Sequence, residues 1–144
     1  HLRTLPGLVV CGGSTGDGKV GGALRLDLAT MRREAMSALV TARSDHACCA
    51  VRGNLAVLGG FTQEGRSSSV EKMHSSSSEE NGGAFADLPP LTCGGIRAAA
   101  AIAVEESDSA AGQVLLIGGY AADRTVSISG ASFTSSGNET LPSL

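Results

Sequence analysis

Apolar residues in this 144-residue chain come in short runs, and three of those runs end in a pair of glycines. The three segments are Leu8–Gly13, Leu55–Gly60 and Val114–Gly119. Gly12 and Gly59 lie 47 positions apart, and Gly59 and Gly118 lie 59 apart. A buried strand that ends in a double glycine and recurs at such a spacing is typical of a repeat architecture. The pattern predicts an all-β chain built from copies of one small sheet.

Other short apolar or alternating runs between these segments predict further strands. They are 24–28, 47–51, 69–73, 85–91, 98–104 and 125–129. The turn Arg52-Gly53-Asn54 joins two of the predicted strands and indicates a hairpin. We count roughly eleven strands and almost no helix. They divide into approximate units 1–45, 46–97 and 98–144.

The unequal spacing of the glycine pairs is explained by two polar insertions. The Ser-rich stretch Ser75–Gly83 adds five residues and the acidic stretch Glu105–Gly112 adds seven, when the later repeat is aligned with His46 opposite Ala98. Both stretches are hydrophilic, so we expect exposed loops. Stacked repeats tolerate insertions in loops while the spacing of their strands is kept.

Composition and charge exclude two classes of partner. Only 3% of the residues are aromatic, with Tyr120 the single tyrosine, while glycine contributes 20 residues. Small side chains must therefore form most of the core. The net charge is −3 and the basic residues are scattered, so we expect no nucleic-acid binding, which needs clustered positive charge. No apolar run approaches the ~18 residues of a membrane span.

The repeated pattern resembles the Kelch repeats. Its features are an apolar strand with Gly-Gly, a second strand, an aromatic residue, and an Arg-x-x-His segment before the next unit. They match Val57-Leu58-Gly59-Gly60, Leu26-Asp27, Phe85 followed by Leu88-Pro89-Pro90-Leu91, and Arg43-Ser44-Asp45-His46-Ala47. The resemblance covers nearly the whole chain. It implies a β-propeller whose blades are four-stranded antiparallel sheets.

Three blades would form only part of such a ring, because Kelch propellers usually have about six or seven. The resemblance therefore implies an incomplete ring, completed by further blades of a longer chain or by another subunit. Two departures stand out. Arg33 occupies the aromatic position of the first unit, and the third junction has Gly94-Gly95-Ile96-Arg97 in place of the Arg-x-x-His spacing.

One segment resembles a nucleotide-binding loop. Gly13-Ser14-Thr15-Gly16-Asp17-Gly18-Lys19 follows a predicted strand and matches the first seven positions of a P-loop. The next residues, Val20-Gly21-Gly22, supply neither the hydroxyl that holds magnesium nor the start of a helix. We therefore interpret the segment as a glycine-rich loop between strands, and expect no cofactor.

Cysteine and histidine spacing indicates no metal centre. His46 opens a predicted strand, where we expect it to pack or to bond a turn. Cys48 and Cys49 are adjacent, so a strand would point them to opposite faces, and we interpret them as small core residues. The spacing of the four cysteines favours a reduced, cytoplasmic setting. We find no catalytic constellation and expect the chain not to be an enzyme.

The remaining functional prediction rests on the loops. In Kelch propellers the segments just after Gly-Gly and the turns that open each blade form one partner-binding face. By position, the resemblance places Phe61, Gln63, Arg97 and Tyr120 on that face. Exposed aromatic rings and an arginine are common interface anchors, although Phe61 and Tyr120 would equally suit packing between blades.

We therefore expect a protein-interaction scaffold, which could be the substrate-recognition part of a larger protein. Two alternatives stay open at this point. One is a structural subunit of a large assembly. The other is a fragment of a Kelch-type enzyme such as an oxidase or a sugar epimerase.

Overall fold

The computed structural model describes residues 7–51, 53–74, 83–104, 112–121, 126–134 and 137–141. Within these ranges every regular element is a β-strand, and all strand pairs are antiparallel, which confirms the prediction of an all-β chain. The same ranges contain no helical segment with the length and apolarity needed to cross a bilayer. Most of the two predicted polar loops, and Arg52 of the predicted turn, lie outside the described residues.

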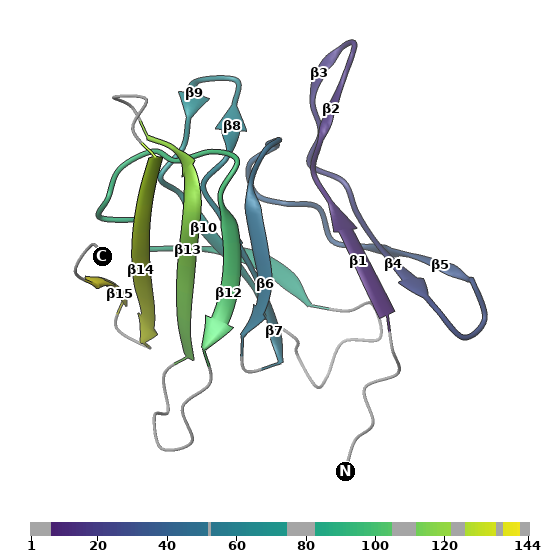
Figure 1. Cartoon of the computed structure of the whole chain (residues 1–144). Coiled ribbons are helices and arrows are strands. Elements are labelled where there is room, and N and C mark those ends of the chain that lie inside the picture. Colours follow the sequence, from purple (N-terminus) through teal and green to yellow (C-terminus); the bar gives the residue numbers. More distant parts are fainter. Residues whose placement is uncertain are drawn as a thin grey trace.

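Three sheets account for most of the strands, and each is built from one continuous stretch of chain (Figure 1). Sheet 1 has the order β1 (Gly7–Cys11), β4 (Ala23–Asp27), β5 (Arg33–Met36). Sheet 2 has the order β6 (Ala47–Val51), β7 (Asn54–Leu58), β10 (Val70–His74), β11 (Ala84–Leu88). Sheet 3 has the order β12 (Ala100–Val104), β13 (Gly112–Tyr120), β14 (Val126–Thr134), β15 (Gly137–Leu141). Neighbouring strands in a sheet follow one another along the chain, apart from the ribbons inserted between them.

Two short ribbons follow the first two glycine pairs. The first pairs β2 (Ser14–Thr15) with β3 (Gly18–Lys19), and the second pairs β8 (Phe61–Thr62) with β9 (Gly65–Arg66). Strands of two residues are too short to show alternation, so the sequence pattern does not predict them. The first ribbon is formed by the P-loop-like segment, which lies between strands as expected.

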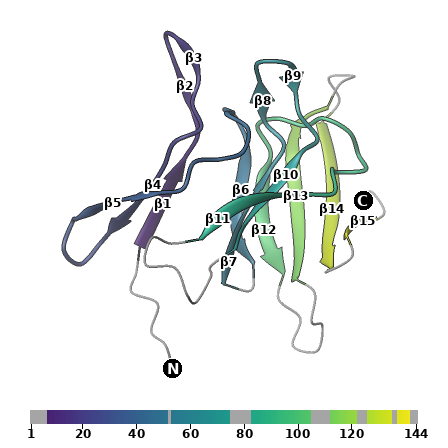
Figure 2. The same ribbon diagram turned by 180° about the vertical axis from the view of Figure 1, so that it is seen from behind.

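Sheet 2 lies between the other two sheets (Figures 1 and 2) and buries apolar residues on both faces. Successive side chains of β7 point to opposite faces, as in any strand. Leu55 and Val57 pack in a cluster with Cys11 and Ala23 of sheet 1. Leu39, Phe85 and Met73 complete that cluster. The central strand therefore supplies both layers of the core.

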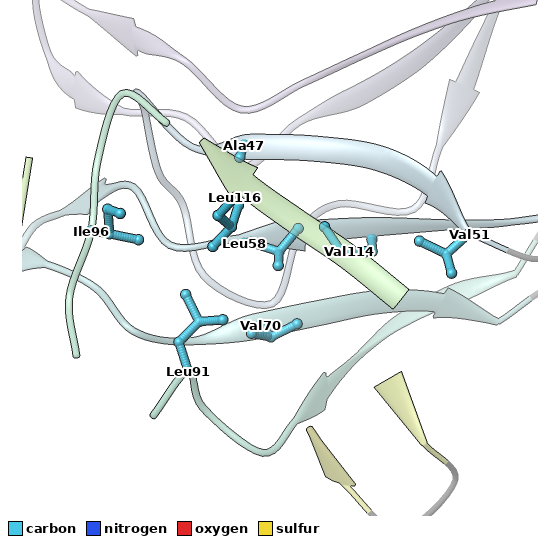
Figure 3. Close-up of a cluster of buried hydrophobic side chains, with 9 residues drawn as sticks. Ala47, Val51, Leu58, Val70, Leu91, Ile96, Val114 and Leu116 are labelled. Atoms are coloured by element: carbon cyan, nitrogen blue, oxygen red, sulfur yellow. The ribbon is translucent and has the colours of Figure 1, made fainter. Parts of the chain in front are cut away.

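The larger core cluster lies between sheets 2 and 3 (Figure 3). Its buried members are all aliphatic: Ala47, Val51, Ala56, Leu58, Val70, Leu91, Ile96, Val114 and Leu116. Full burial of a valine or leucine side chain stabilises the fold by roughly 1.5–3 kcal/mol. Phe85 belongs to the other cluster, so this layer is made without a buried aromatic ring among the described residues.

The three glycine pairs share one backbone conformation. Both members of each pair have positive φ: 67° and 120° at Gly12 and Gly13, 63° and 98° at Gly59 and Gly60, 72° and 89° at Gly118 and Gly119. Residues with a Cβ rarely adopt this region. At Gly60 there is also no room, because a Cβ would lie 2.6 Å from the Ser44 carbonyl oxygen and 2.8 Å from the His46 Cβ.

Backbone hydrogen bonds around the first two glycine pairs repeat in the same order. The Gly12 N–H donates to Gly22 O, and the Gly59 N–H donates to Ser69 O. The next glycines bond the following linker, with Gly13 N–H donating to Arg43 O and Gly60 N–H donating to Ile96 O. The first two glycine pairs thus bind successive linkers in the same way, and Ile96 stands where Arg43 stands.

The residues after those linker positions also correspond. Ser44 forms a two-way backbone bridge with Phe61, and Arg97 forms the same bridge with Tyr120. Asp45 and Ala98 follow, both with positive φ (50° and 56°). The Ala98 N–H donates to the Asp45 carbonyl at 2.7 Å, so equivalent residues of successive repeats touch.

This correspondence corrects the alignment by one residue. His46 is equivalent to Ala99, not Ala98, because each lies under the second glycine of its pair, Gly60 or Gly119. The later repeat therefore has one extra residue at the Gly94-Gly95 junction, and its acidic stretch adds one residue fewer than the first alignment gave. The first alignment missed this extra residue because it placed every insertion in a loop.

A buried ion pair holds the linker between sheets 1 and 2 to sheet 2. Arg43 Nη2 lies 2.5 Å from Glu71 Oε2, and both side chains are fully buried. Arg43 Nη1 also donates to Gly59 O at 2.7 Å, and the Glu71 carboxylate accepts the backbone N–H groups of Val40 and Thr41. Every charge is therefore paired and hydrogen-bonded, which a buried pair requires.

The positions equivalent to Arg43 and Glu71 in the next repeat carry different side chains. Ile96 takes the place of Arg43, and Ser129 takes the register position of Glu71 in sheet 3, since Ser129 pairs with Leu116 as Glu71 pairs with Val57. Register also makes Arg33 equivalent to Phe85, because Arg33 pairs with Leu26 as Phe85 pairs with Met73.

We predict that Gly60→Ala destabilises the fold far more than Gly13→Ala. Both positions have positive φ, which costs an alanine about 1–2 kcal/mol. A Cβ at Gly13 meets nothing within 4 Å, whereas at Gly60 it meets the Ser44 carbonyl. Overpacking adds roughly 1–3 kcal/mol. Urea denaturation of both variants measures the difference, and equal losses would contradict the steric argument.

We predict that Arg43→Leu lowers the free energy of unfolding by about 3–5 kcal/mol, because it leaves the Glu71 carboxylate buried without its cation. Glu34→Ala is the matched control. It breaks the Arg25–Glu34 ion pair, whose 3.9 Å separation and exposed side chains make it worth less than about 1 kcal/mol. Denaturant midpoints compare the two, and a loss at Arg43 no larger than the loss at Glu34 would refute the role of the buried pair.

Candidate functional site

Three of the four residues predicted to bind a partner come together at one end of the sheets. Phe61 begins β8, Tyr120 ends β13, and Arg97 lies in the linker before sheet 3. The backbone bridge between Arg97 and Tyr120 fixes two of them side by side. Figure 1 shows the two ribbons projecting from this same end.

Arg97 lies between the two aromatic rings. Its Cζ is 5.6 Å from the centroid of the Phe61 ring and 5.7 Å from that of the Tyr120 ring. Lys19 approaches Phe61 as well, with Nζ 5.1 Å from the ring centroid. Cations at these distances are attracted by the ring faces. We name Lys19, Phe61, Arg97 and Tyr120 the cation–aromatic cluster.

Polar contacts hold the two cations of the cluster in place. Lys19 Nζ donates to Ser44 Oγ at 2.8 Å, and Arg97 Nη1 lies 3.4 Å from Asp45 Oδ2. Arg97 Nε is buried and has no hydrogen-bond partner among the described residues. The cluster stays accessible, because the Arg97 side chain is 40% exposed and Tyr120 is 50% exposed.

Gln63, the fourth predicted residue, lies on the neighbouring turn between β8 and β9. Its amide reaches the other ribbon, since a Cβ added at Gly18 would lie 3.2 Å from Gln63 Nε2. Gln63 thus joins the two ribbons beside the cluster. Sequence reasoning missed Lys19, whose only signal was its place in the P-loop-like segment.

The surroundings of the cluster carry both signs of charge. Arg66 of β9 donates to the backbone carbonyl of Ala121, directly after Tyr120. Asp17 and Glu64 lie in the turns of the two ribbons. Aromatic rings with an arginine between them and charges around them are suited to contact with another protein.

A second group of reactive residues lies between sheets 1 and 2. Cys11 Sγ is 3.5 Å from His46 Nε2, and the Cys11 thiol hydrogen-bonds Cys48. That hydrogen bond lowers the pKa of Cys48 to about 6 and raises the pKa of Cys11, which burial raises further. Burial and the Arg43 charge lower the pKa of His46.

Cys49 points to the opposite face and packs against the core cluster between sheets 2 and 3, as predicted for adjacent cysteines. Burial and the nearby Cys48 raise its pKa to about 11. Across the part of the chain that the structure describes, no group of three or more His, Cys, Asp or Glu side chains has the arrangement of a metal site.

No protein-family model matches this chain, and no curated protein matches it either.

We predict that Cys48 is alkylated by iodoacetamide with a pH midpoint near 6, because only the thiolate reacts. Removing the hydrogen bond with Cys11→Ala raises the pKa of Cys48 and slows its reaction at pH 7 by at least about tenfold. Tandem mass spectrometry in a Cys49→Ala background isolates the site. Cys93→Ala is the control and leaves the midpoint unchanged. A midpoint that Cys11→Ala does not move would refute the thiol pair.

Proposed function

We propose that this chain is part of a Kelch-type β-propeller that acts as a protein-interaction scaffold and binds its partner through the cation–aromatic cluster. In this proposal sheets 1, 2 and 3 are successive blades. The chain itself performs no catalysis and needs no cofactor. The partner is a protein segment that contacts the exposed end where the two ribbons project.

The repeated backbone contacts support the propeller part of the proposal. Sheets 2 and 3 each have four antiparallel strands in chain order, the arrangement of a propeller blade. Each of the first two glycine pairs bonds the next linker, and the equivalent Asp45 and Ala98 touch. Contacts between equivalent residues are expected where repeats surround a common axis.

The cluster supports the binding part. Its side chains come from three separate repeats, with Lys19 after the first glycine pair, Phe61 after the second and Tyr120 after the third. Each ring is therefore presented at an equivalent place, on strands rather than on a long loop. Rigid, half-exposed aromatic and arginine side chains are typical anchors of an interface.

The observation that carries the proposal is the position of Arg97. Its guanidinium faces two rings, one of which is half exposed, and it contacts the exposed Asp45 carboxylate at 3.4 Å. An exposed pair of this kind contributes little to stability. Arg97 can therefore exchange Asp45 for a carboxylate of a partner at small cost to the fold.

We predict that a peptide selected from a random phage library on the wild-type chain binds at this cluster. Arg97→Ala or Phe61→Ala should weaken its binding by at least about tenfold, as expected for an interface anchor. Arg32→Ala, a surface arginine in the turn before β5, is the matched control and should leave the affinity unchanged. Fluorescence polarisation gives the dissociation constants.

Thermal melts of the same variants show whether the fold is kept. A selected peptide whose affinity is equal for the wild type and both cluster variants would overturn the proposed site. Failure of the library to yield any binder would overturn the scaffold proposal itself.

A further inference from the structure

On the two outermost sheets, one pair of neighbouring strands presents apolar side chains on the outer face. On sheet 1 these are cross-strand partners of β1 and β4, namely Leu8, Val10, Leu24 and Leu26. On sheet 3 they belong to β12 and β13, namely Ile102, Val104, Leu115 and Ile117. Val10 is 50% exposed and Ile102 is 52% exposed. Exposed apolar side chains on two neighbouring strands of one sheet form a contiguous patch, and such a patch normally marks an interaction surface.

The contacts inside the chain show how such faces are used. We call the side of a sheet that meets the next sheet in the chain its forward face, and the side that meets the preceding sheet its backward face. The forward face of sheet 1 packs on the backward face of sheet 2, where Cys11 meets the cluster of Val57. The forward face of sheet 2 packs on the backward face of sheet 3, where Leu58 meets the cluster of Leu116.

The two faces left over are therefore unlike and complementary. Sheet 1 exposes its backward face and sheet 3 exposes its forward face. Val10 lies two residues before its glycine pair, as Val57 does on the buried backward face of sheet 2. Ile117 lies directly before its pair, as Leu58 does on the buried forward face of sheet 2. Each exposed face repeats one half of an interface that the chain already forms twice.

We propose that a second copy of this chain covers these faces by head-to-tail stacking, with the forward face of sheet 3 in one copy on the backward face of sheet 1 in its partner. Two copies related by a twofold axis then form two identical contacts and close a ring of six sheets. Such a contact joins unlike patches, and it stays finite only because the rotation closes. This inference rests on the stacking of the sheets and is independent of ligand binding at the cation–aromatic cluster.

Arg33 distinguishes this contact from the internal ones. It stands on the backward face of sheet 1 where sheet 2 carries the buried Phe85. A charged side chain at this edge suits an interface between subunits, where a polar rim surrounds an apolar centre. Leu24, which stands where sheet 2 carries Glu71, extends the apolar centre.

Sedimentation velocity of the intact chain over a wide concentration range tests the proposal. We expect a particle of twice the monomer mass. Val10→Lys and Ile102→Lys place a charge on the backward face of sheet 1 and on the forward face of sheet 3, and each variant alone should be monomeric. Val40→Lys is the matched control, since Val40 is 55% exposed but lies in the linker outside both faces, and it should stay dimeric.

An equimolar mixture of the two face variants separates head-to-tail stacking from a symmetric contact. The Val10→Lys copy keeps a normal sheet 3 face and the Ile102→Lys copy keeps a normal sheet 1 face, so one intact contact forms and a two-copy particle returns. Circular dichroism confirms that each variant is folded. A wild-type chain that stays monomeric, a particle larger than two copies, a dimer that only one variant disrupts, or a mixture that stays monomeric would each overturn the proposal.

Discussion

The close approach of the backbone at the glycine pairs is the constraint on which the arrangement of the sheets depends. At Gly60 the chain passes so near the Ser44 carbonyl and the His46 Cβ that no side chain fits, and at Gly119 it passes equally near Arg97 and Ala99. Because the N–H groups of Gly13 and Gly60 bond the linker that opens the next sheet, the end of one repeat and the start of another are held together by main-chain atoms. The side chains around these junctions can therefore vary.

The variation is visible at the position that Arg43 and Ile96 share. Arg43 reaches a buried carboxylate and several carbonyls, whereas Ile96 belongs to the aliphatic cluster with Leu91 and Leu116. One geometry is thus compatible with an ionic network and with simple apolar packing. Burying the charged pair carries a desolvation penalty that the apolar version avoids. What the charged version adds is orientation, because the Arg43 guanidinium bonds the Gly59 carbonyl and the Glu71 carboxylate bonds the Val40 N–H of the linker.

Much of the fold could be predicted from the chain because its pattern is local. The strands before each Gly-Gly, the role of the glycines and the opposite orientation of Cys48 and Cys49 follow from alternation and from backbone sterics. The junction at Gly94-Gly95 was misaligned by one residue because its extra residue lies outside the loops. The contacts of Arg43 with Glu71 and of Cys11 with Cys48 join residues 28 and 37 positions apart, and no local pattern encodes them. In the candidate site, position after the glycine pair indicated Phe61 and Tyr120, but nothing in the sequence showed that Lys19 would meet Phe61.

The coverage of sheet 2 on both faces has a consequence for how the molecule opens. Sheets that contact only their neighbours form a one-dimensional array, in which local unfolding begins where a neighbour is lacking. In a single copy the hydrogen bonds of β7 and β10 are shielded by layers on either side, whereas those of sheets 1 and 3 are shielded on one. Local unfolding should therefore begin in sheets 1 and 3 and proceed inward. The backbone hydrogen bonds of sheet 2 should be the last to become exposed to water.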